Sequence, residues 1–162
     1  MKKGNVRIGE ILVKKGMITE AQLNDALLSQ KITPAFLGTI LMNKGVIGSR
    51  QLAEALSEQF DLPLVEIKSQ YADAELTSRF SSSIILDHRC FPLRSDENTV
   101  TVAIINPLNA VAIAKVEEEA SPRTVKWLLV TEEDMNDAIK NYRQSISANI
   151  QKLLRKDKEG QK

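Results

Sequence analysis

The apolar positions of the first 60 residues repeat with a period of 29. The segment RIGEILVKKGMITEAQLNDALLSQ, Arg7 to Gln30, aligns with FLGTILMNKGVIGSRQLAEALSEQ, Phe36 to Gln59. Ten of the 24 aligned positions are identical: Gly9/Gly38, Ile11/Ile40, Leu12/Leu41, Lys15/Lys44, Gly16/Gly45, Ile18/Ile47, Leu23/Leu52, Ala26/Ala55, Leu27/Leu56 and Gln30/Gln59. This duplication predicts two copies of one structural unit.

Each copy is predicted to form two short helices. Apolar residues at helical spacing predict the first helix: Ile8, Ile11 and Leu12. Gly16 then ends it as a C-terminal cap. Thr19 is the expected N-cap of the second helix, with Gln22 placed as in a capping box, and Ser49 is the expected cap in the second copy. The second helix is expected to bury a stripe of Leu23, Ala26 and Leu27, with Gln30 one turn later on the same face; Leu52, Ala55, Leu56 and Gln59 repeat it in the second copy.

Short helices of this kind need a packing partner. Each is about nine to twelve residues long, and most helical stability in water comes from packing an apolar face. The linker Lys31–Ala35 contains Pro34, which helps to separate the copies. We therefore expect the copies to pack on each other in a pseudo-two-fold arrangement, which suits a ligand that is itself nearly two-fold.

The rest of the chain alternates strand and helix patterns. Strands are predicted at Leu64–Ile67, Cys90–Leu93, Thr99–Ile105 and Val125–Val130. Helices are predicted at Asp73–Phe80, at Ser82–Arg89, from Asn106-Pro107 to about Glu119, and from a Thr131 cap to about Gln144. The polar turn Ser95–Asn98 predicts a hairpin between the second and third strands.

Together these patterns predict an α+β fold in three segments. Residues 1–60 form the tandem helix-pair repeat of four short helices, and residues 61–145 form a small α/β domain with a mixed sheet and packed helices. Residues 146–162 are expected to be a basic tail or linker, because Lys152 to Lys162 carry five basic side chains against Asp157 and Glu159. A basic helix lying on a membrane surface is the alternative for this segment.

Composition narrows the class of protein. Apolar residues at 43% and charged residues at 27% allow a sizeable core. A formal net charge of +1 and only 4% aromatic residues argue against a nucleic-acid partner. The start MKKGNVRIGE lacks the apolar core of a signal peptide, and no apolar run approaches the roughly 20 residues that span a bilayer. We therefore expect a cytoplasmic protein with no direct membrane insertion.

The sequence lacks the motifs of common catalytic sites. It has no GxxxxGK[ST] phosphate loop, no GxGxxG, no HExxH and no cysteine pair with zinc spacing. His88 and Cys90 are the only histidine and cysteine; they can share one face of a strand but lack a third partner. We therefore predict a binding protein that is not an enzyme and that requires no cofactor.

The duplicated segment resembles a known motif. Arg7 to Gln30 is similar to RLGxxLLxxGLIxxxxLxxxLxxQ of the MshEN domain, a family that carries the motif twice with a spacer of the length of Lys31–Ala35. This domain opens type II secretion and type IV pilus assembly ATPases of the GspE and PilB kind. The segments DLPLVEI, HRCFPLR and TVAIINPLN are similar to its α/β part, so the resemblance covers roughly residues 6 to 145.

The resemblance implies a regulatory domain that recognises cyclic di-GMP, with each motif holding about half of the ligand. Arg7 would contact guanine or phosphate, and the apolar side chains would pack on the ligand and on the other copy. The first motif contributes Arg7, Ile8, Gly9, Leu12, Val13, Gly16, Met17, Ile18, Leu23, Leu27 and Gln30. The second contributes Phe36, Leu37, Gly38, Leu41, Met42, Gly45, Val46, Ile47, Leu52, Leu56 and Gln59.

Phe36 departs from the family pattern, because the second motif would carry arginine there. A charge-assisted hydrogen bond contributes on the order of 1.5–3 kcal/mol, so its loss would weaken binding roughly tenfold to a hundredfold. An aromatic ring can instead stack on a base. The sequence leaves both consequences open. Family ATPases continue beyond this domain, so the chain is expected to be either an excised domain or a free-standing regulator.

Two other classes of function compete with ligand binding. The first is a protein-interaction adaptor that docks an inner-membrane platform protein, with Phe36 marking a degenerate nucleotide site. The second is a reader of duplex DNA, because short helix pairs can resemble helix-turn-helix units. The net charge of +1 disfavours the DNA reader.

Overall fold

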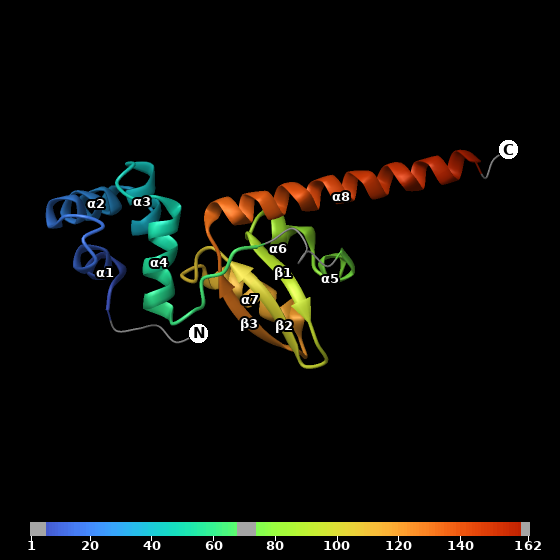
Figure 1. Ribbon diagram of the computed structural model, residues 1–162, viewed down its shortest axis with the longest axis horizontal. Helices are drawn as coiled ribbons and strands as arrows, with labels where there is room; N and C mark the ends of the chain where they lie inside the picture. The colour runs from blue at the N-terminus through green and yellow to red at the C-terminus, as the bar shows by residue number, and fades with distance from the viewer. Residues whose placement is uncertain (1–5, 68–73, 160–162) are drawn as a thin grey trace.

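The computed structural model describes residues 6–67 and 74–159 and consists of two parts (Figure 1). The first part holds α1 (Ile8–Lys14), α2 (Glu20–Ile32), α3 (Leu37–Asn43) and α4 (Ser49–Phe60). The second holds α5 (Ala74–Ser78), α6 (Ser82–Leu86), β1 (Cys90–Ser95), β2 (Thr99–Ile104), α7 (Ala110–Ala120), β3 (Thr124–Leu129) and α8 (Glu132–Glu159). The predicted α+β fold, a helical repeat followed by a small α/β part, is confirmed.

The two copies of the repeat fold alike. α1 and α3 have seven residues each and begin directly after the equivalent positions Arg7 and Phe36. Gly16 and Gly45 follow these helices with φ of 67° and 68°, the left-handed conformation that glycine adopts without strain. Both ends are Schellman motifs, with bonds from Gly16 N to Val13 O, Met17 N to Leu12 O, Gly45 N to Met42 O and Val46 N to Leu41 O.

The N-caps of the second helices differ between the copies. Thr19 and Gln22 form the predicted capping box: Thr19 N donates to Gln22 Oε1 (2.8 Å), and Gln22 N donates to Thr19 Oγ1 (3.2 Å). The prediction that Ser49 caps α4 is wrong, because the period of 29 places Gly48 at that position. Gly48 N donates to Gln51 Oε1 (2.9 Å), but glycine has no hydroxyl for the reciprocal bond.

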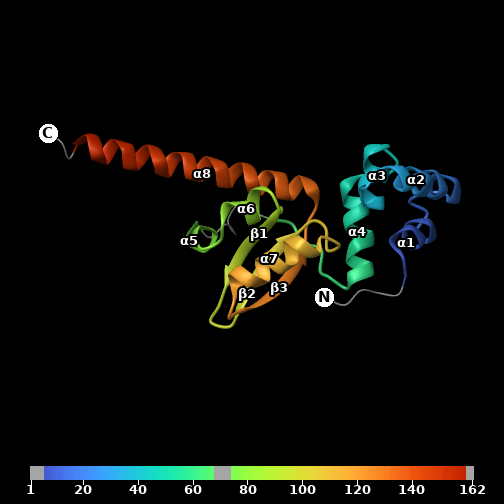
Figure 2. The same ribbon diagram turned by 180° about the vertical axis from the view of Figure 1, so that it is seen from behind.

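The sheet has the order β1-β2-β3 and is mixed, as predicted. β1 and β2 form an antiparallel hairpin, and α7 connects β2 to β3, which run parallel. Successive residues of β2 point to opposite faces: Val102 belongs to the apolar cluster that includes Val116 of α7, and Ala103 to the cluster that includes Met135 of α8. The sheet therefore lies between α7 and α8, which is visible from both sides (Figures 1 and 2).

Three predictions on the short elements need correction. Leu64–Ile67 forms no named strand and contributes a single bridge, from Leu64 to Leu129. α5 and α6 are shorter than the predicted helices Asp73–Phe80 and Ser82–Arg89, and Asp73 lies outside the described residues. Arg89 has a left-handed φ of 53°, which excludes it from a helix.

α7 begins at Ala110, not at Asn106 as predicted. Asn106 Oδ1 accepts a hydrogen bond from Leu108 N (3.0 Å) and makes a turn before the helix. Asn109 is the N-cap, since its Oδ1 accepts from Ala112 N (3.1 Å). The turn keeps Asn106 next to the end of β2, which matters for the candidate site.

α8 begins as predicted and ends later. Thr131 Oγ1 accepts from Asp134 N (3.1 Å), which confirms the predicted cap. The helix does not stop near Gln144 but continues to Glu159, since the sequence offers neither glycine nor proline until Gly160. The predicted tail, residues 146–162, is therefore helical up to residue 159, and residues 160–162 lie outside the described part. The exposed Ile150 continues the helical spacing there.

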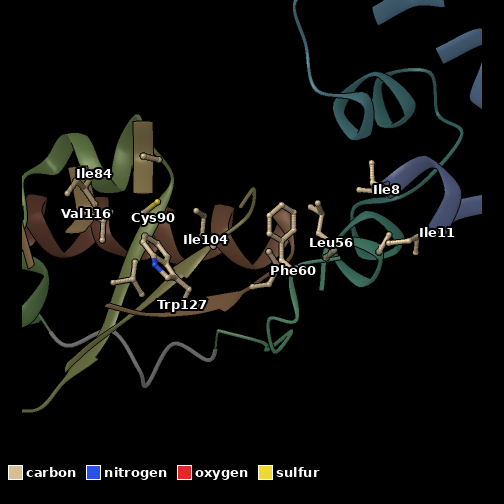
Figure 3. Close-up of a cluster of buried hydrophobic side chains, with 14 of the residues drawn as sticks. Ile8, Ile11, Leu56, Phe60, Ile84, Cys90, Ile104, Val116 and Trp127 are labelled. Carbon is tan, nitrogen blue, oxygen red and sulfur yellow. The ribbon is translucent and has the colours of Figure 1, made fainter. Parts of the chain in front are cut away.

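One apolar cluster runs through both parts of the molecule (Figure 3). Its members include Ile8 and Ile11 from the repeat and Ile104 and Trp127 from the sheet. α4 joins the two sets through buried side chains that include Phe60. The two parts therefore share a core rather than being linked by a flexible connection.

Replacing Gly38 with alanine is expected to destabilise the protein by about 1–3 kcal/mol. An added Cβ would lie 2.4 Å from Leu52 Cδ1 and 2.9 Å from its Cδ2, so α3 must separate from α4 or Leu52 must leave its rotamer. Urea unfolding measures the change. An open helical position would instead gain about 0.5–1 kcal/mol from the same substitution, so stabilisation would contradict this close packing. The cost should shrink in a Leu52→Ala background.

Candidate functional site

The last glutamine of each copy of the repeat forms a hydrogen bond to the backbone of the other copy. Gln30 Nε2 donates to Ala35 O (2.9 Å), and Gln59 Nε2 donates to Val6 O (3.2 Å). Positions 6 and 35 are equivalent, so each glutamine holds the chain just before the first helix of the other copy. Such reciprocal contacts are what a two-fold relation produces, as predicted. Both side chains therefore position the helix N-termini.

Ion pairs on the surface follow the same crosswise pattern. Lys15 Nζ lies 2.8 Å from Glu58 Oε2, and Lys44 Nζ lies 2.6 Å from Asp25 Oδ2, so each pair joins one copy to the other. The hydrogen bond to Glu58 raises the pKa of Lys15 above its ordinary value. All four side chains are partly or largely exposed, so these pairs add little stability and mainly set the register of the copies.

A cavity of about 280 Å³ lies where the second copy meets the α/β part. From the repeat it is lined by Ile8, Gln30, Phe36, Leu37, Gly38, Thr39, Met42, Asn43, Ser49, Leu52, Ala53 and Leu56. From the α/β part it is lined by Ile105, Asn106, Leu108, Val130 and Glu132. Eight of the residues predicted from the sequence meet here: Ile8, Gln30, Phe36, Leu37, Gly38, Met42, Leu52 and Leu56.

Most of the other predicted site residues lie elsewhere. Buried residues of the repeat are Gly9, Leu12, Ile18, Leu41, Ile47 and Gln59, which pack inside it. Partly buried at its surface are Val13, Met17, Leu23 and Val46, and exposed outside the cavity are Arg7, Gly16, Leu27 and Gly45. The prediction that Leu27 is buried is therefore wrong, although its equivalent Leu56 is 3% exposed. Of the four predicted glycines, Gly38 lines the cavity, and the Cβ sides of Gly9 and Gly38 face Leu23 and Leu52.

Arg7 and Phe36 occupy equivalent N-cap positions but different surroundings. Phe36 is 43% exposed and lines the cavity. Arg7 is exposed, and no hydrogen bond or ion pair engages its guanidinium within residues 6–67 and 74–159. It does not line the cavity, although the neighbouring Ile8 does. Arg7 is thus a free fork of five donors beside the site.

Ser49 ties the repeat to the α/β part at the rim of this cavity. Its hydroxyl accepts a hydrogen bond from Glu132 N (3.1 Å) and donates to the carboxylate of Glu133. The donated bond lowers the pKa of Glu133, because it favours the charged form. One side chain therefore connects the start of α4 to the start of α8.

Replacing Ser49 with alanine is expected to cost about 1 kcal/mol at neutral pH, since the hydroxyl bridge is lost. The pKa of Glu133 should rise toward its ordinary value, which carbon-detected NMR of the carboxyl measures. The depressed pKa contributes stability above the unfolded pKa of this carboxyl, and that contribution is lost as the pH falls through the folded pKa. The difference between wild type and variant should therefore narrow in acid. If the difference in unfolding free energy between wild type and variant were the same at neutral and at acidic pH, the hydrogen bond between Ser49 and Glu133 would be contradicted.

The residues that the α/β part contributes were not predicted as site residues. Asn106 and Leu108 follow β2, and Glu132 opens α8. Their contact with α3 and α4 depends on how the two parts pack, which no spacing in the sequence reveals. The segment Asn106-Pro107 was a local signal of a turn after a buried strand, where polar side chains often gather.

The Cys90 thiol, which the sequence placed beside His88, is buried in β1. Burial raises the pKa of the Cys90 thiol to about 12, and its Sγ lies 3.5 Å from His88 O. Within the described residues no three acidic, histidine or cysteine side chains gather to hold a metal ion. The same part of the chain contains no helix long and apolar enough to cross a membrane.

Comparisons with known proteins agree with this architecture. The structure of MshE with cdg, cyclic di-GMP, is 24% identical, with a TM-score of 0.73 over 85% of this chain and 99% of that chain. The N-terminal domain of XpsE is 17% identical in one crystal form, with a TM-score of 0.66 over 87% of this chain and 96% of that chain. A second crystal form gives 18% identity and a TM-score of 0.55 over 87% and 97%. These likenesses show the fold, and no curated protein matches the chain.

The family comparison adds an assignment. The model of the MshEN domain matches residues 60–149, which is more than half of the chain. This match covers the α/β part and the beginning of the exposed stretch of α8, and it leaves out the duplicated helices. The repeat is thus an independent line of evidence, because its two motifs were recognised from residues outside the matched range. The chain belongs to the MshEN domain family.

Proposed function

We propose that this domain binds cyclic di-GMP and passes ligand occupancy to a secretion or pilus ATPase. The observation that carries the proposal is the cavity at the N-terminus of α3, which the second motif and the α/β part line together. The motif residues, the free guanidinium of Arg7 and the similarity to MshE solved with cyclic di-GMP support it. A site shared by two parts lets a ligand favour one arrangement of them over another.

The two halves of the site differ in chemistry. In the first half, Arg7 offers donors that fit a phosphate or the edge of guanine. In the second half, Phe36 offers an aromatic face to a base. The cavity volume of about 280 Å³ lies just below the usual range for ligand pockets, roughly 300–1,000 Å³, so it accommodates one half of a dinucleotide. The ligand would therefore reach from the cavity across the repeat toward Arg7.

Isothermal titration calorimetry of the purified chain with cyclic di-GMP tests the proposal. We expect saturable heat with one ligand per chain and a dissociation constant in the micromolar range or below. A thermal shift with the same ligand provides a second readout, because a ligand that binds only the folded state raises the melting temperature. The absence of both heat and a thermal shift at millimolar ligand would exclude this function.

A protein-docking adaptor is the second candidate, and the outer face of α2 favours it. Leu28 is 60% exposed and Ile32 is 87% exposed, whereas α4 buries Leu56, the equivalent of the 40% exposed Leu27, at 3%. α4 covers this face by packing it on the α/β part, whereas the equivalent face of α2 is exposed. A pull-down with the cytoplasmic part of an inner-membrane platform protein should lose its signal with Leu28→Asp if this face is the contact.

The location and the lack of catalysis belong to the same proposal. A receptor for cyclic di-GMP that regulates a motor ATPase works in the cytoplasm and needs no chemistry of its own. Purified protein incubated with cyclic di-GMP should return the ligand unchanged by chromatography. If the protein broke down the ligand, and the Arg7→Ala variant did so as well, the protein would have an enzymatic activity different from the proposed function.

A further inference from the structure

The cavity beside α3 is lined by no cationic side chain of the described residues that could neutralise a phosphate. Among the described residues that line it, none is lysine or arginine, and the one charged group is the carboxylate of Glu132. A phosphate is bound by cations and converging donors, and a carboxylate repels it. If the domain binds a cyclic dinucleotide, on which this assignment rests, the part that enters the cavity is therefore a neutral base.

The polar side chains that line the cavity include possible donors, among them Thr39 and Asn43, and one carboxylate, that of Glu132. Ser49 Oγ is engaged with Glu132 N and with Glu133, and Asn106 Oδ1 accepts from Leu108 N. Gln30 Nε2 is engaged with Ala35 O. In contrast, no hydrogen bond or ion pair within the described residues engages the carboxylate of Glu132. This carboxylate can accept two parallel hydrogen bonds.

Guanine is the base whose edge matches a free carboxylate. Its N1–H and its 2-amino group are adjacent donors, whereas adenine places its 6-amino donor next to the N1 acceptor. The apolar lining of the cavity, which includes Phe36 and Met42, offers surfaces for the flat faces of the ring. The volume of about 280 Å³ accommodates one base but not the whole cyclic dinucleotide.

We propose that Glu132 reads one guanine of the ligand by accepting hydrogen bonds from N1–H and the 2-amino group, while Phe36 stacks on the base. This assignment explains why phenylalanine, and not the arginine of the family motif, stands at position 36. An arginine at that position would line the same cavity and would compete for the carboxylate of Glu132. The two half-sites then differ in kind: a carboxylate reads the base in the second, and Arg7 binds in the first.

Glu132→Gln tests the assignment by calorimetry with three ligands: cyclic di-GMP, cyclic di-AMP and cyclic di-inosine monophosphate, which lacks the 2-amino group. The wild type should prefer cyclic di-GMP to both others. In Glu132→Gln the preference for cyclic di-GMP over cyclic di-IMP should shrink roughly tenfold or more, because the acceptor of the amino group has lost its charge. Glu118→Gln makes the same charge change on the exposed surface of α7 and should leave the preference unchanged.

The outcomes separate this assignment from the proposed function. If the wild type binds none of the ligands, the nucleotide function itself fails and the assignment fails with it. If the wild type binds cyclic di-GMP and Glu132→Gln keeps the same preference, the function stands and the assignment is overturned. Unfolding curves of both variants should stay close to the wild type, because no hydrogen bond or ion pair of the described residues engages the Glu132 side chain.

Discussion

Arg7→Ala is expected to weaken binding of cyclic di-GMP roughly tenfold to a hundredfold, equivalent to the loss of a charge-assisted hydrogen bond of about 1.5–3 kcal/mol. The guanidinium has no partner within the described residues, so its removal breaks no internal contact. Because Phe36 occupies the equivalent position, the second copy cannot replace the lost charge. Calorimetry measures the change in affinity, and thermal unfolding without ligand should be unchanged.

Arg50→Ala is the matched control for this experiment. Arg50 is also exposed on the repeat, but its guanidinium is paired with Glu54 (3.3 Å) and Glu66 (3.6 Å). The substitution removes the same charge from a side chain that does not line the cavity and is already paired with carboxylates, so affinity should change by less than about twofold at physiological salt. Equal losses in both variants would show that net charge, not the position of Arg7, determines binding.

Leu12→Ala and Leu41→Ala are each expected to destabilise the protein by about 2–5 kcal/mol. Both side chains are 0% exposed and hold equivalent positions in α1 and α3, where the two copies pack together. The loss combines lost apolar burial with a cavity that short helices cannot easily close. Urea unfolding monitored by circular dichroism measures both values in one series.

Leu28→Ala provides the control of the same residue type. Leu28 is 60% exposed on α2, and its truncation should change stability by no more than about 0.5 kcal/mol. If Leu12→Ala unfolded only the first copy, leaving the second copy and the α/β part with wild-type stability, the copies would not form one cooperative unit. The crosswise bonds from Gln30 and Gln59 lead us to expect a single transition for both.

The repeat was predictable because local signals and periodicity agree. Gly16 and Gly45 mark the ends of α1 and α3, and Thr19 with Gln22 marks the start of α2. The N-cap at Ser49 was mispredicted because a serine is the stronger local signal, while Gly48 is the position equivalent to Thr19. Applying the period strictly would have corrected it.

The site was only partly predictable. Phe36 and Met42 are motif residues that line the cavity. Asn106 and Glu132 also line it, but they come from the α/β part, which meets the motif only in the folded protein. Gln59 looked like a ligand residue because the motif ends there, yet it is 5% exposed and bonded to Val6 O. A motif residue that supports the fold and one that contacts a ligand look the same in a sequence.

The length of α8 was missed for a different reason. No residue between Thr131 and Glu159 ends a helix, while the polar composition after Gln144 suggested a tail. Apolar residues continue at helical spacing beyond the sheet, with Ile146 at 37% exposure and Ile150 at 51%. Helical spacing without a stop signal was the better guide here than composition.

The most direct test of the nucleotide site is a map of amide shifts on adding cyclic di-GMP to isotope-labelled protein. The shared cavity predicts the largest shifts at the start of α3, from Phe36 to Met42, together with Asn106–Leu108, Glu132 and the neighbourhood of Arg7. Shifts confined to the outer face of α2 or to α8 beyond Tyr142, or no shifts at saturating ligand, would contradict a nucleotide site between the repeat and the α/β part.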